Sequence, residues 1–187
     1  MRDVERFFVI TGGPGSGKTT LVEALAAAGF ARTAEAGRAV IQEQLANGGG
    51  ALPWKDRAAF AEKMLERDIQ SYKATIAQTG PVFFDRGIPD VVGYLRLCGL
   101  PVPVHLMKAA TDFRYHRRVF IAPPWREIYA QDAERKQDFD EAQRTYDAMV
   151  EIYSKLDYEL VILPRMNVEE RVRFVVDAIA RQGHRQH

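Results

Sequence analysis

Short apolar runs alternate with longer segments of mixed polarity along the whole sequence. The apolar runs have the length of strands and are bounded by glycine, proline or polar residues, whereas the longer segments have the spacing of helices. Alternation of this kind indicates βα units that build a parallel sheet covered by helices on both faces. We therefore predict an α/β fold, a three-layer sandwich around a five-stranded parallel sheet.

Individual elements follow from the same pattern. The predicted strands cover residues 6–11, 30–34, 81–85, 118–121 and 159–163. The predicted helices cover residues 20–28, 37–46, 54–78, 89–97, 102–114, 139–156 and 168–181. Asn167 supplies an N-cap for the last helix. Because no internal repeat or linker divides the chain, we expect a single nucleotide-binding domain over residues 1–187.

Composition excludes several classes of function. The chain is 47% hydrophobic and 27% charged, and 26 Lys and Arg against 25 Asp and Glu leave a net charge of +1. This balance provides no overall field for nucleic acid or an anionic membrane, and we do not expect nucleic acid as a partner. No apolar run approaches the ~20 residues of a membrane span, and no signal-peptide pattern begins the chain, which predicts a cytoplasmic protein. The single cysteine, Cys98, is expected in the core.

A glycine-rich stretch between the first strand and the first helix matches the phosphate-binding pattern G-x-x-x-x-G-K-[ST]. The predicted loop consists of Gly12, Gly13, Pro14, Gly15, Ser16, Gly17, Lys18, Thr19 and Thr20. Glycines let successive backbone N–H groups turn toward phosphate oxygens, Lys18 can reach the β- and γ-phosphates, and the Thr19 hydroxyl can ligate Mg²⁺. A turn that binds nothing would not need the Lys-Thr pair. The loop predicts ATP with Mg²⁺ and leaves GTP open.

Two acidic residues close predicted strands at the edge where parallel sheets bind ligands. Asp85 can reach Mg²⁺ or act as a base, and Arg86 beside it suits a phosphate or carboxylate. Glu35 lies one helical turn before Arg38, so these two can pair with each other or together address a substrate. The structural alternatives are that Asp85 caps a helix and that Glu35 stabilises a helix dipole.

Residues 122–140 form a charged stretch after the fourth strand. The stretch carries Arg126, Arg135 and Lys136 ahead of Arg144 on the next helix. Phosphoryl transfer spreads negative charge over the transferred group, and a mobile segment that carries arginine can neutralise it. We predict a lid with Arg135 as its catalytic residue; a solvated amphipathic helix is the open alternative.

Aromatic residues near the sheet edge suggest where a substrate binds. We expect Trp54, Phe60 and Tyr94 to line its pocket together with Arg38 and Arg86, although each aromatic side chain also suits a core. By analogy with other P-loop kinases, we expect the turn at residues 164–167 to select adenine.

In order along the chain, these motifs resemble the AAA-domain family of predicted ATPases and kinase-like proteins. That family is related to the bacterial nicotinamide riboside kinase domain and more distantly to thymidylate and deoxynucleoside kinases. The segments that carry the resemblance are 12–19, 35–38, 82–90 and 123–129, with Arg135 after them. The resemblance covers nearly the whole chain and implies the P-loop NTPase fold.

The resemblance also implies roles for the acidic residues. In deoxynucleoside kinases a Glu that closes the second strand is the base and an acid-Arg pair closes the third, which maps the base onto Glu35 and the pair onto Asp85 and Arg86. This chain departs from that pattern because Ala36 stands where those kinases usually have proline.

Two functions from different classes fit these features. One is an ATP-Mg-dependent kinase that acts on a hydroxyl of a small, nucleoside-like molecule, in which Glu35 or Asp85 is the base. The other is a regulatory NTPase with slow hydrolysis and a protein or lipid partner. No Asn-Lys-x-Asp motif occurs, which argues against an ordinary GTPase. A single helix after the fifth strand leaves no room for the lid domain of a ring motor.

Overall fold

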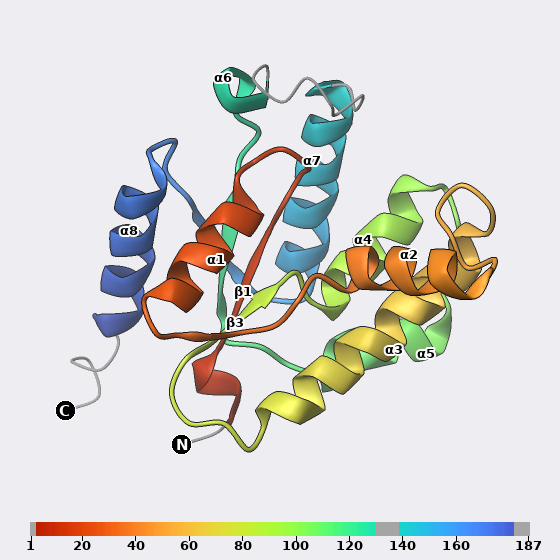
Figure 1. Cartoon of the computed structure of the whole chain (residues 1–187), viewed down its shortest axis with the longest axis horizontal. Coiled ribbons are helices and arrows are strands. Elements are labelled where there is room, and N and C mark those ends of the chain that lie inside the picture. Colours follow the sequence, from red (N-terminus) through yellow and green to blue (C-terminus); the bar gives the residue numbers. More distant parts are fainter. Residues whose placement is uncertain (1–2, 130–138, 182–187) are drawn as a thin grey trace.

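A computed structural model of the protein describes residues 3–129 and 139–181. Within them one sheet contains five parallel strands in the order β2-β3-β1-β4-β5 (Figure 1). The strands are β1 Phe7–Gly12, β2 Ala31–Arg32, β3 Val82–Asp85, β4 Arg118–Ala122 and β5 Glu159–Ile162. The predicted α/β architecture with a five-stranded parallel sheet is therefore confirmed.

Eight α-helices and one short 3₁₀-helix, η1, accompany the sheet in the described residues. They are η1 Asp3–Arg6, α1 Lys18–Ala27, α2 Ala36–Asn47, α3 Arg57–Thr75, α4 Ile88–Leu97, α5 Val104–Asp112, α6 Arg126–Tyr129, α7 Phe139–Lys155 and α8 Val168–Ala180. Within residues 3–129 and 139–181, none of these helices combines the length and the apolar character needed to cross a bilayer.

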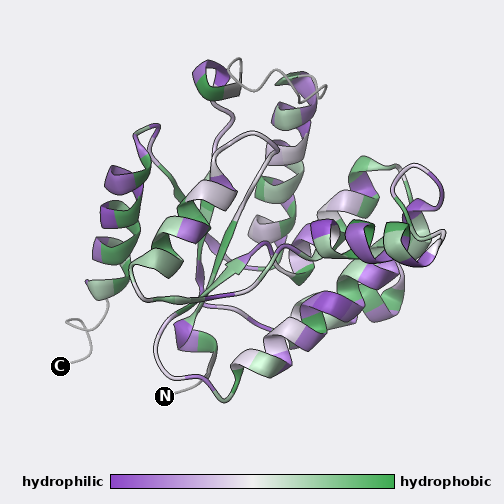
Figure 2. Ribbon diagram, viewed as in Figure 1, coloured by the Kyte–Doolittle hydropathy of each residue, from purple (hydrophilic) through white to green (hydrophobic). Residues whose placement is uncertain are grey.

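The central strand separates two hydrophobic cores. Successive side chains of a strand point to opposite faces, so Phe7 and Val9 pack with α3, α4, α5 and α7, whereas Phe8 and Ile10 pack with α1 and α8. Figure 1 shows these two groups of helices on opposite sides of the sheet. In Figure 2 the strands are green between helices whose outer faces carry much of the purple. The sheet is thus buried on both faces.

The strand order creates a crevice at the carboxyl edge of the sheet. After β1 the chain enters α1 on one face, whereas after β3 it enters α4 on the other face. β1 and β3 are hydrogen-bonded neighbours, with Ile10 opposite Asp85. Connections that diverge from adjacent strands leave a space between them, which is where ligands bind in open parallel sheets.

Two of the differences between the predicted and the observed element boundaries bear on the site. β2 ends at Arg32, three residues before Glu35, because it is an edge strand that pairs only with β3. The long helix α3 begins at Arg57 rather than at residue 54, because the Asp56 carboxylate accepts a 2.9 Å hydrogen bond from the Ala59 N–H and caps it there. The first shift places Glu35 at the N-cap of α2 rather than at the end of a strand, and the second leaves Trp54 in the turn before α3.

Candidate functional site

A cavity of about 1080 Å³ opens beside the carboxyl edge of the sheet. One part, which we call the loop end, is formed by residues 14–20. The other part, which we call the helix end, is lined by side chains from α2, α3, α4 and α7. Glu35, Arg38 and Arg86 are among the lining residues, so the structure brings the predicted substrate residues to the same cavity as the predicted loop.

Close backbone packing shapes the predicted phosphate loop. Gly12 has a φ of 135°, and a Cβ there would come within 2.4 Å of the Ala122 carbonyl oxygen. A Cβ on Gly13 would come equally close to the Ala142 carbonyl oxygen at the start of α7. Side chains therefore cannot occupy these positions, and the backbone itself forms the wall.

Lys18 is folded back across this loop. Its Nζ donates to the Gly13 carbonyl oxygen at 2.5 Å and lies 3.3 Å from the Ser16 Oγ, and the side chain is only 6% exposed. Burial, followed by the nearby Arg86 charge, lowers the pKa of the ammonium group to about 7, although the carboxylates of Asp85, Glu35 and Asp90 oppose both effects. A buried ammonium group held by a neutral carbonyl would gain from an anionic oxygen, which makes stronger hydrogen bonds.

Arg171 of α8 holds the loop from behind. Its Nη1 donates to the Ser16 carbonyl oxygen and its Nε to the Pro164 carbonyl oxygen, both at 2.8 Å. The guanidinium also lies 5.1 Å from the centre of the Trp125 ring. Arg171 thus joins the loop to the turn that we expected to select adenine. Sequence reasoning missed it, although Arg171 shares the inward face of α8 with Val175, which was a usable signal.

Arg86 connects the two ends of the cavity. Its Nη1 donates to the Gly12 carbonyl oxygen at 3.0 Å and lies 3.3 Å from Asp90 Oδ1, while its Nε is 3.4 Å from Glu35 Oε1. Burial lowers the pKa of the guanidinium, but Asp90, Glu35 and the adjacent Asp85 outweigh burial and raise it overall. In the described residues Glu35 therefore pairs with Arg86. The Glu35–Arg38 pair, which was one of the two arrangements that the sequence left open, does not form.

The backbone at Arg86 is unusual for a residue with a side chain. Its φ is 68°, a left-handed conformation that costs roughly 1–2 kcal/mol for a non-glycine residue. The Arg86 N–H donates to the Ile10 carbonyl oxygen at 3.0 Å, which ties this conformation to β1. Strained residues held by their surroundings cluster at functional sites, and here the turn brings the guanidinium to the crevice.

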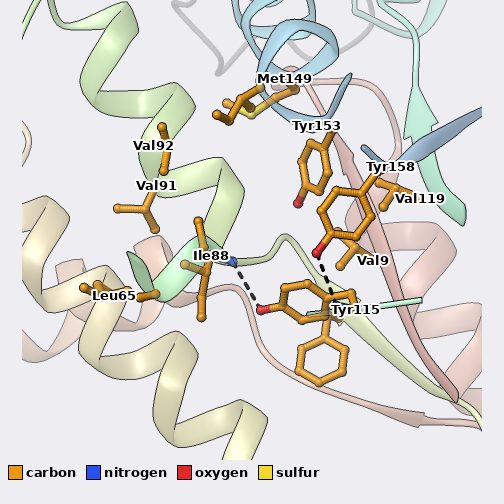
Figure 3. Close-up of a cluster of buried hydrophobic side chains, with 14 of the residues drawn as sticks. Val9, Leu65, Ile88, Val91, Val92, Tyr115, Val119, Met149, Tyr153 and Tyr158 are labelled. Carbon is orange, nitrogen blue, oxygen red and sulfur yellow. Dashed lines mark hydrogen bonds between the residues drawn. The ribbon is translucent and has the colours of Figure 1, made fainter. Parts of the chain in front are cut away.

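Asp90 organises the base of the crevice. Its carboxylate accepts hydrogen bonds from the Thr11 hydroxyl, from the Gly87 N–H at 3.0 Å and from the Tyr153 hydroxyl at 2.6 Å. In Figure 3 a second tyrosine, Tyr115, accepts a hydrogen bond from the first N–H of α4 in the same core. Asp90 thereby links β1, α4 and α7 to Arg86. The sequence predicted no role for Asp90, although an acid three residues after Gly87 is a helix-capping signal.

Asp85 lies behind the cavity wall rather than in it. Its side chain is 5% exposed, and its Oδ1 has no hydrogen-bond partner among the described residues. Burial raises the pKa of the carboxyl group, and the charge of Glu35 adds to this, while Arg86 and Lys18 act in the opposite direction. An enclosed carboxylate oxygen without a partner fits a water molecule or a cation in place of a protein donor.

The oxygen donors of Thr19 and Asp85 suit a magnesium ion whose remaining ligands are phosphate oxygens and water. Thr19 lines the cavity, and Asp85 contributes an unpartnered oxygen close to Lys18 and Arg86. In the described part of the chain no three His, Cys, Asp or Glu side chains are arranged to hold a metal. Mg²⁺ commonly takes one or two protein oxygens and completes its shell with phosphate and water, so Thr19 and Asp85 fit the ion.

The helix end combines aromatic and acidic side chains. Phe60 of α3 and Tyr94 of α4 line it with ring centres 5.5 Å apart, as expected. Trp54 does not line this cavity and is 62% exposed, because it belongs to the turn before the cap of α3. Cys98, expected in the core, is half-buried and lines the cavity at the end of α4. The acidic residue Asp68 also lines this end and was missed.

Only part of the predicted lid lies in the described residues. The short helix α6 and the start of α7 belong to it, and the Arg126 guanidinium lies 4.1 Å from the centre of the Phe139 ring. Arg135 and Lys136 lie outside the described residues. Arg144, on α7, lines the cavity.

Comparison with solved structures identifies the fold. The NadR protein in complex with NR is similar with a TM-score of 0.72 and 16% sequence identity over 95% of this chain. The match covers 50% of NadR, so the chain spans about half the length of that protein. A search of curated proteins finds no match.

Two kinases are similar over nearly their full length. Deoxyadenosine kinase from M. mycoides, with products dCMP and dCDP bound, has a TM-score of 0.58 and 13% identity, covering 94% of this chain and 99% of that one. Thymidylate kinase from Ehrlichia chaffeensis has a TM-score of 0.59 and 15% identity, covering 92% and 97%. The chain therefore has a P-loop kinase-like fold. A family model described as AAA domain matches residues 7–171, and the chain belongs to that family.

Proposed function

We propose that this chain is a kinase that transfers the γ-phosphoryl group of ATP-Mg to a hydroxyl group of a nucleoside-like small molecule. The observation that carries the proposal is Glu35, which is 25% exposed on the cavity wall and lies 3.4 Å from Arg86. The same cavity contains the phosphate loop at its other end. Glu35 lies in the same cavity as the loop but pairs with Arg86 instead of a loop residue, so its carboxylate can serve a second substrate.

The loop end binds the nucleotide in this proposal. Lys18 exchanges its contact with the Gly13 carbonyl oxygen for phosphate oxygens, and Gly12–Thr20 supply the surrounding backbone and hydroxyl groups. Thr19 and Asp85, the latter directly or through water, would hold Mg²⁺. Bound ATP-Mg supplies the phosphoryl group and the cation that neutralises its charge.

The helix end binds and orients the acceptor. Glu35 accepts the proton of the attacking hydroxyl group, and Arg86 holds that carboxylate in place while its own charge faces the crevice. Arg38 contributes a further contact to the acceptor. Arg135 of the lid stabilises the charge on the transferred group, and Arg144 supplies a second cation from α7.

Support for a nucleoside-like acceptor comes from what the similar structures bind. NadR is described with NR, and the deoxyadenosine kinase with dCMP and dCDP. The helix end is compatible with a ring system because Phe60 and Tyr94 line it. Aromatic side chains provide apolar surface on which a planar base can stack.

The direct test is acceptor-stimulated release of ADP. The purified chain is mixed with ATP-Mg, or GTP-Mg as a comparison, and with nicotinamide riboside, deoxyadenosine, deoxycytidine, thymidine or dTMP in separate assays. We expect one of these acceptors to raise the rate at least about tenfold and to appear as a phosphorylated product. Glu35→Gln should remove the stimulated rate, whereas Glu23→Gln on the outer face of α1 should not. Slow hydrolysis that no acceptor changes would instead favour the regulatory NTPase.

A further inference from the structure

Asp68 is an acidic side chain that the structure buries without a partner. It lies on α3, is 8% exposed and lines the helix end of the cavity. Within residues 3–129 and 139–181 its carboxyl group has no hydrogen bond or ion pair. Its carboxyl oxygens are not fully enclosed, so a ligand in the cavity can reach them.

The position of Asp68 relative to Glu35 follows from α3. Phe60, Met64 and Asp68 are spaced four residues apart and all line the cavity, so they lie on one face of the helix. A Cβ built on Gly37 would lie 3.3 Å from the Met64 Sδ and 3.7 Å from the Glu35 Oε1. The same Cβ would lie 3.6 Å from the Phe60 Cζ, so Glu35 lies near the stretch of α3 from Phe60 to Met64, and Asp68 follows Met64 by about one helical turn.

The charges around Asp68 determine which form of the carboxyl group faces the cavity. Burial raises its pKa well above the ordinary value of 3.8, and the carboxylate of Asp90 raises it further. Arg86 acts in the opposite direction, but it is already paired with Glu35 and Asp90. A protonated carboxyl group presents an O–H donor next to a carbonyl acceptor.

We propose that Asp68 recognises a planar group of the acceptor that presents a hydrogen-bond acceptor beside a donor, such as the amide or amidine edge of a heterocyclic base. This rests on the proposed function and identifies a part of the acceptor other than the reacting hydroxyl group. In this arrangement Glu35 binds the hydroxyl group of the acceptor, Phe60 and Tyr94 pack against its ring, and Asp68 forms hydrogen bonds to the edge of that ring. The acceptor class is therefore a nucleoside with an uncharged base rather than a sugar alone.

Two substitutions at Asp68 separate hydrogen bonding from charge. Asp68→Asn keeps a donor beside an acceptor, whereas Asp68→Leu removes both with a similar volume. Glu66→Gln, on the exposed side of α3, is the matched control. Adenosine, deoxycytidine, nicotinamide riboside and methyl ribofuranoside, a sugar without a base, are each titrated calorimetrically into the protein saturated with AMP-PNP and Mg²⁺.

We expect adenosine or deoxycytidine to bind, with Asp68→Leu weakening binding about 10- to 100-fold and Asp68→Asn by less than about fivefold. AMP-PNP affinity should be unchanged in every variant. Asp68→Leu should also melt at or above the temperature of the wild-type chain, because it removes an unpaired buried carboxyl group. A lower melting temperature with unchanged nucleoside binding would make Asp68 structural and overturn the inference.

Other results would overturn the inference in distinguishable ways. If Asp68→Asn is as weak as Asp68→Leu and the cation nicotinamide riboside binds best, Asp68 acts through its charge. If Asp68→Leu weakens the binding of methyl ribofuranoside as much as the binding of a nucleoside, Asp68 does not contact the base. If acceptors are phosphorylated and both variants behave as wild type, the inference fails while the proposed function stands. If no acceptor is phosphorylated by the wild-type chain, both fail.

Discussion

The loop end and the helix end of the cavity are built in different ways. At the loop end the polar groups are already in contact, with Lys18 on Gly13 and Arg171 on Ser16. At the helix end Asp68 is buried without a partner and the surrounding side chains come from four helices. The loop end is thus preorganised by backbone, which suits a ligand part common to all nucleoside triphosphates. The helix end is set by side chains that can change without disturbing the loop, which suits the choice of acceptor.

Arg86 is the point at which the two ends meet. It contacts the loop through Gly12 and the helix end through Glu35, and its backbone is strained. Substitutions on either side of Arg86 should therefore affect one ligand and leave the other unchanged.

The largest expected effect is on turnover at the helix end. Glu35→Gln should reduce phosphorylation of the acceptor by a factor on the order of 10²–10⁴, because an amide can hold a hydroxyl group but cannot accept its proton. ATP-Mg affinity should stay within about twofold of wild type, as measured by calorimetry. A large loss of ATP affinity would place Glu35 at the loop end. A fully active variant would instead leave Asp85 as the base.

At the loop end, Lys18→Met should weaken ATP binding about 10- to 100-fold, because it removes charge-assisted hydrogen bonds to phosphate. Lys18 is buried, so methionine is chosen to keep the length of the side chain. Binding of the acceptor without nucleotide should be unchanged. Calorimetry with each ligand separately checks both statements. Unaltered ATP affinity would remove the loop from the proposed function.

A smaller effect is expected behind the loop. Arg171→Lys keeps a positive charge but cannot contact the Ser16 and Pro164 carbonyl oxygens together, since an ammonium group lacks the planar fork of a guanidinium. We expect ATP affinity to fall about threefold to tenfold and the melting temperature to decrease by a few degrees. Arg173→Lys, on the exposed face of the same helix, is the control. Equal behaviour of the two variants would mean that the loop is held without Arg171.

The smallest expected effect is on the pH dependence of folding stability, and it comes from Asp68 at the helix end. Because the folded-state pKa of Asp68 is raised above 3.8, the folded chain binds more protons than the unfolded chain above that pH, and stability falls as pH rises toward the raised pKa. Asp68→Asn should remove this slope, which is at most about 1.4 kcal/mol per pH unit. Urea unfolding at pH 5, 6, 7 and 8 measures it. Besides Asp90 and Arg86, Glu35 and Asp85 face Asp68 and remain in both proteins. Parallel pH profiles would show that Asp68 is not protonated.

The sequence by itself determined the parts of this protein that are contiguous along the chain. The phosphate-loop pattern, the five strands and the acid at the end of β3 could all be predicted, because periodicity and a short motif carry the information locally. The exact end of β2 could not be predicted, since an edge strand lasts only as long as its neighbour pairs with it.

Only the tertiary structure decided which distant side chains meet. Asp90 is bound by Thr11 and Tyr153, which are 79 and 63 residues away, and Arg171 contacts a loop residue 155 positions earlier. Glu35 could have paired with Arg38 one turn away, but the left-handed turn at Arg86 brings another cation to it. Burial of Asp68 likewise depends on how α3 packs against its neighbouring elements. A sequence pattern records which residues share a face, whereas partner, distance and burial are set by the packing of elements that are far apart in the chain.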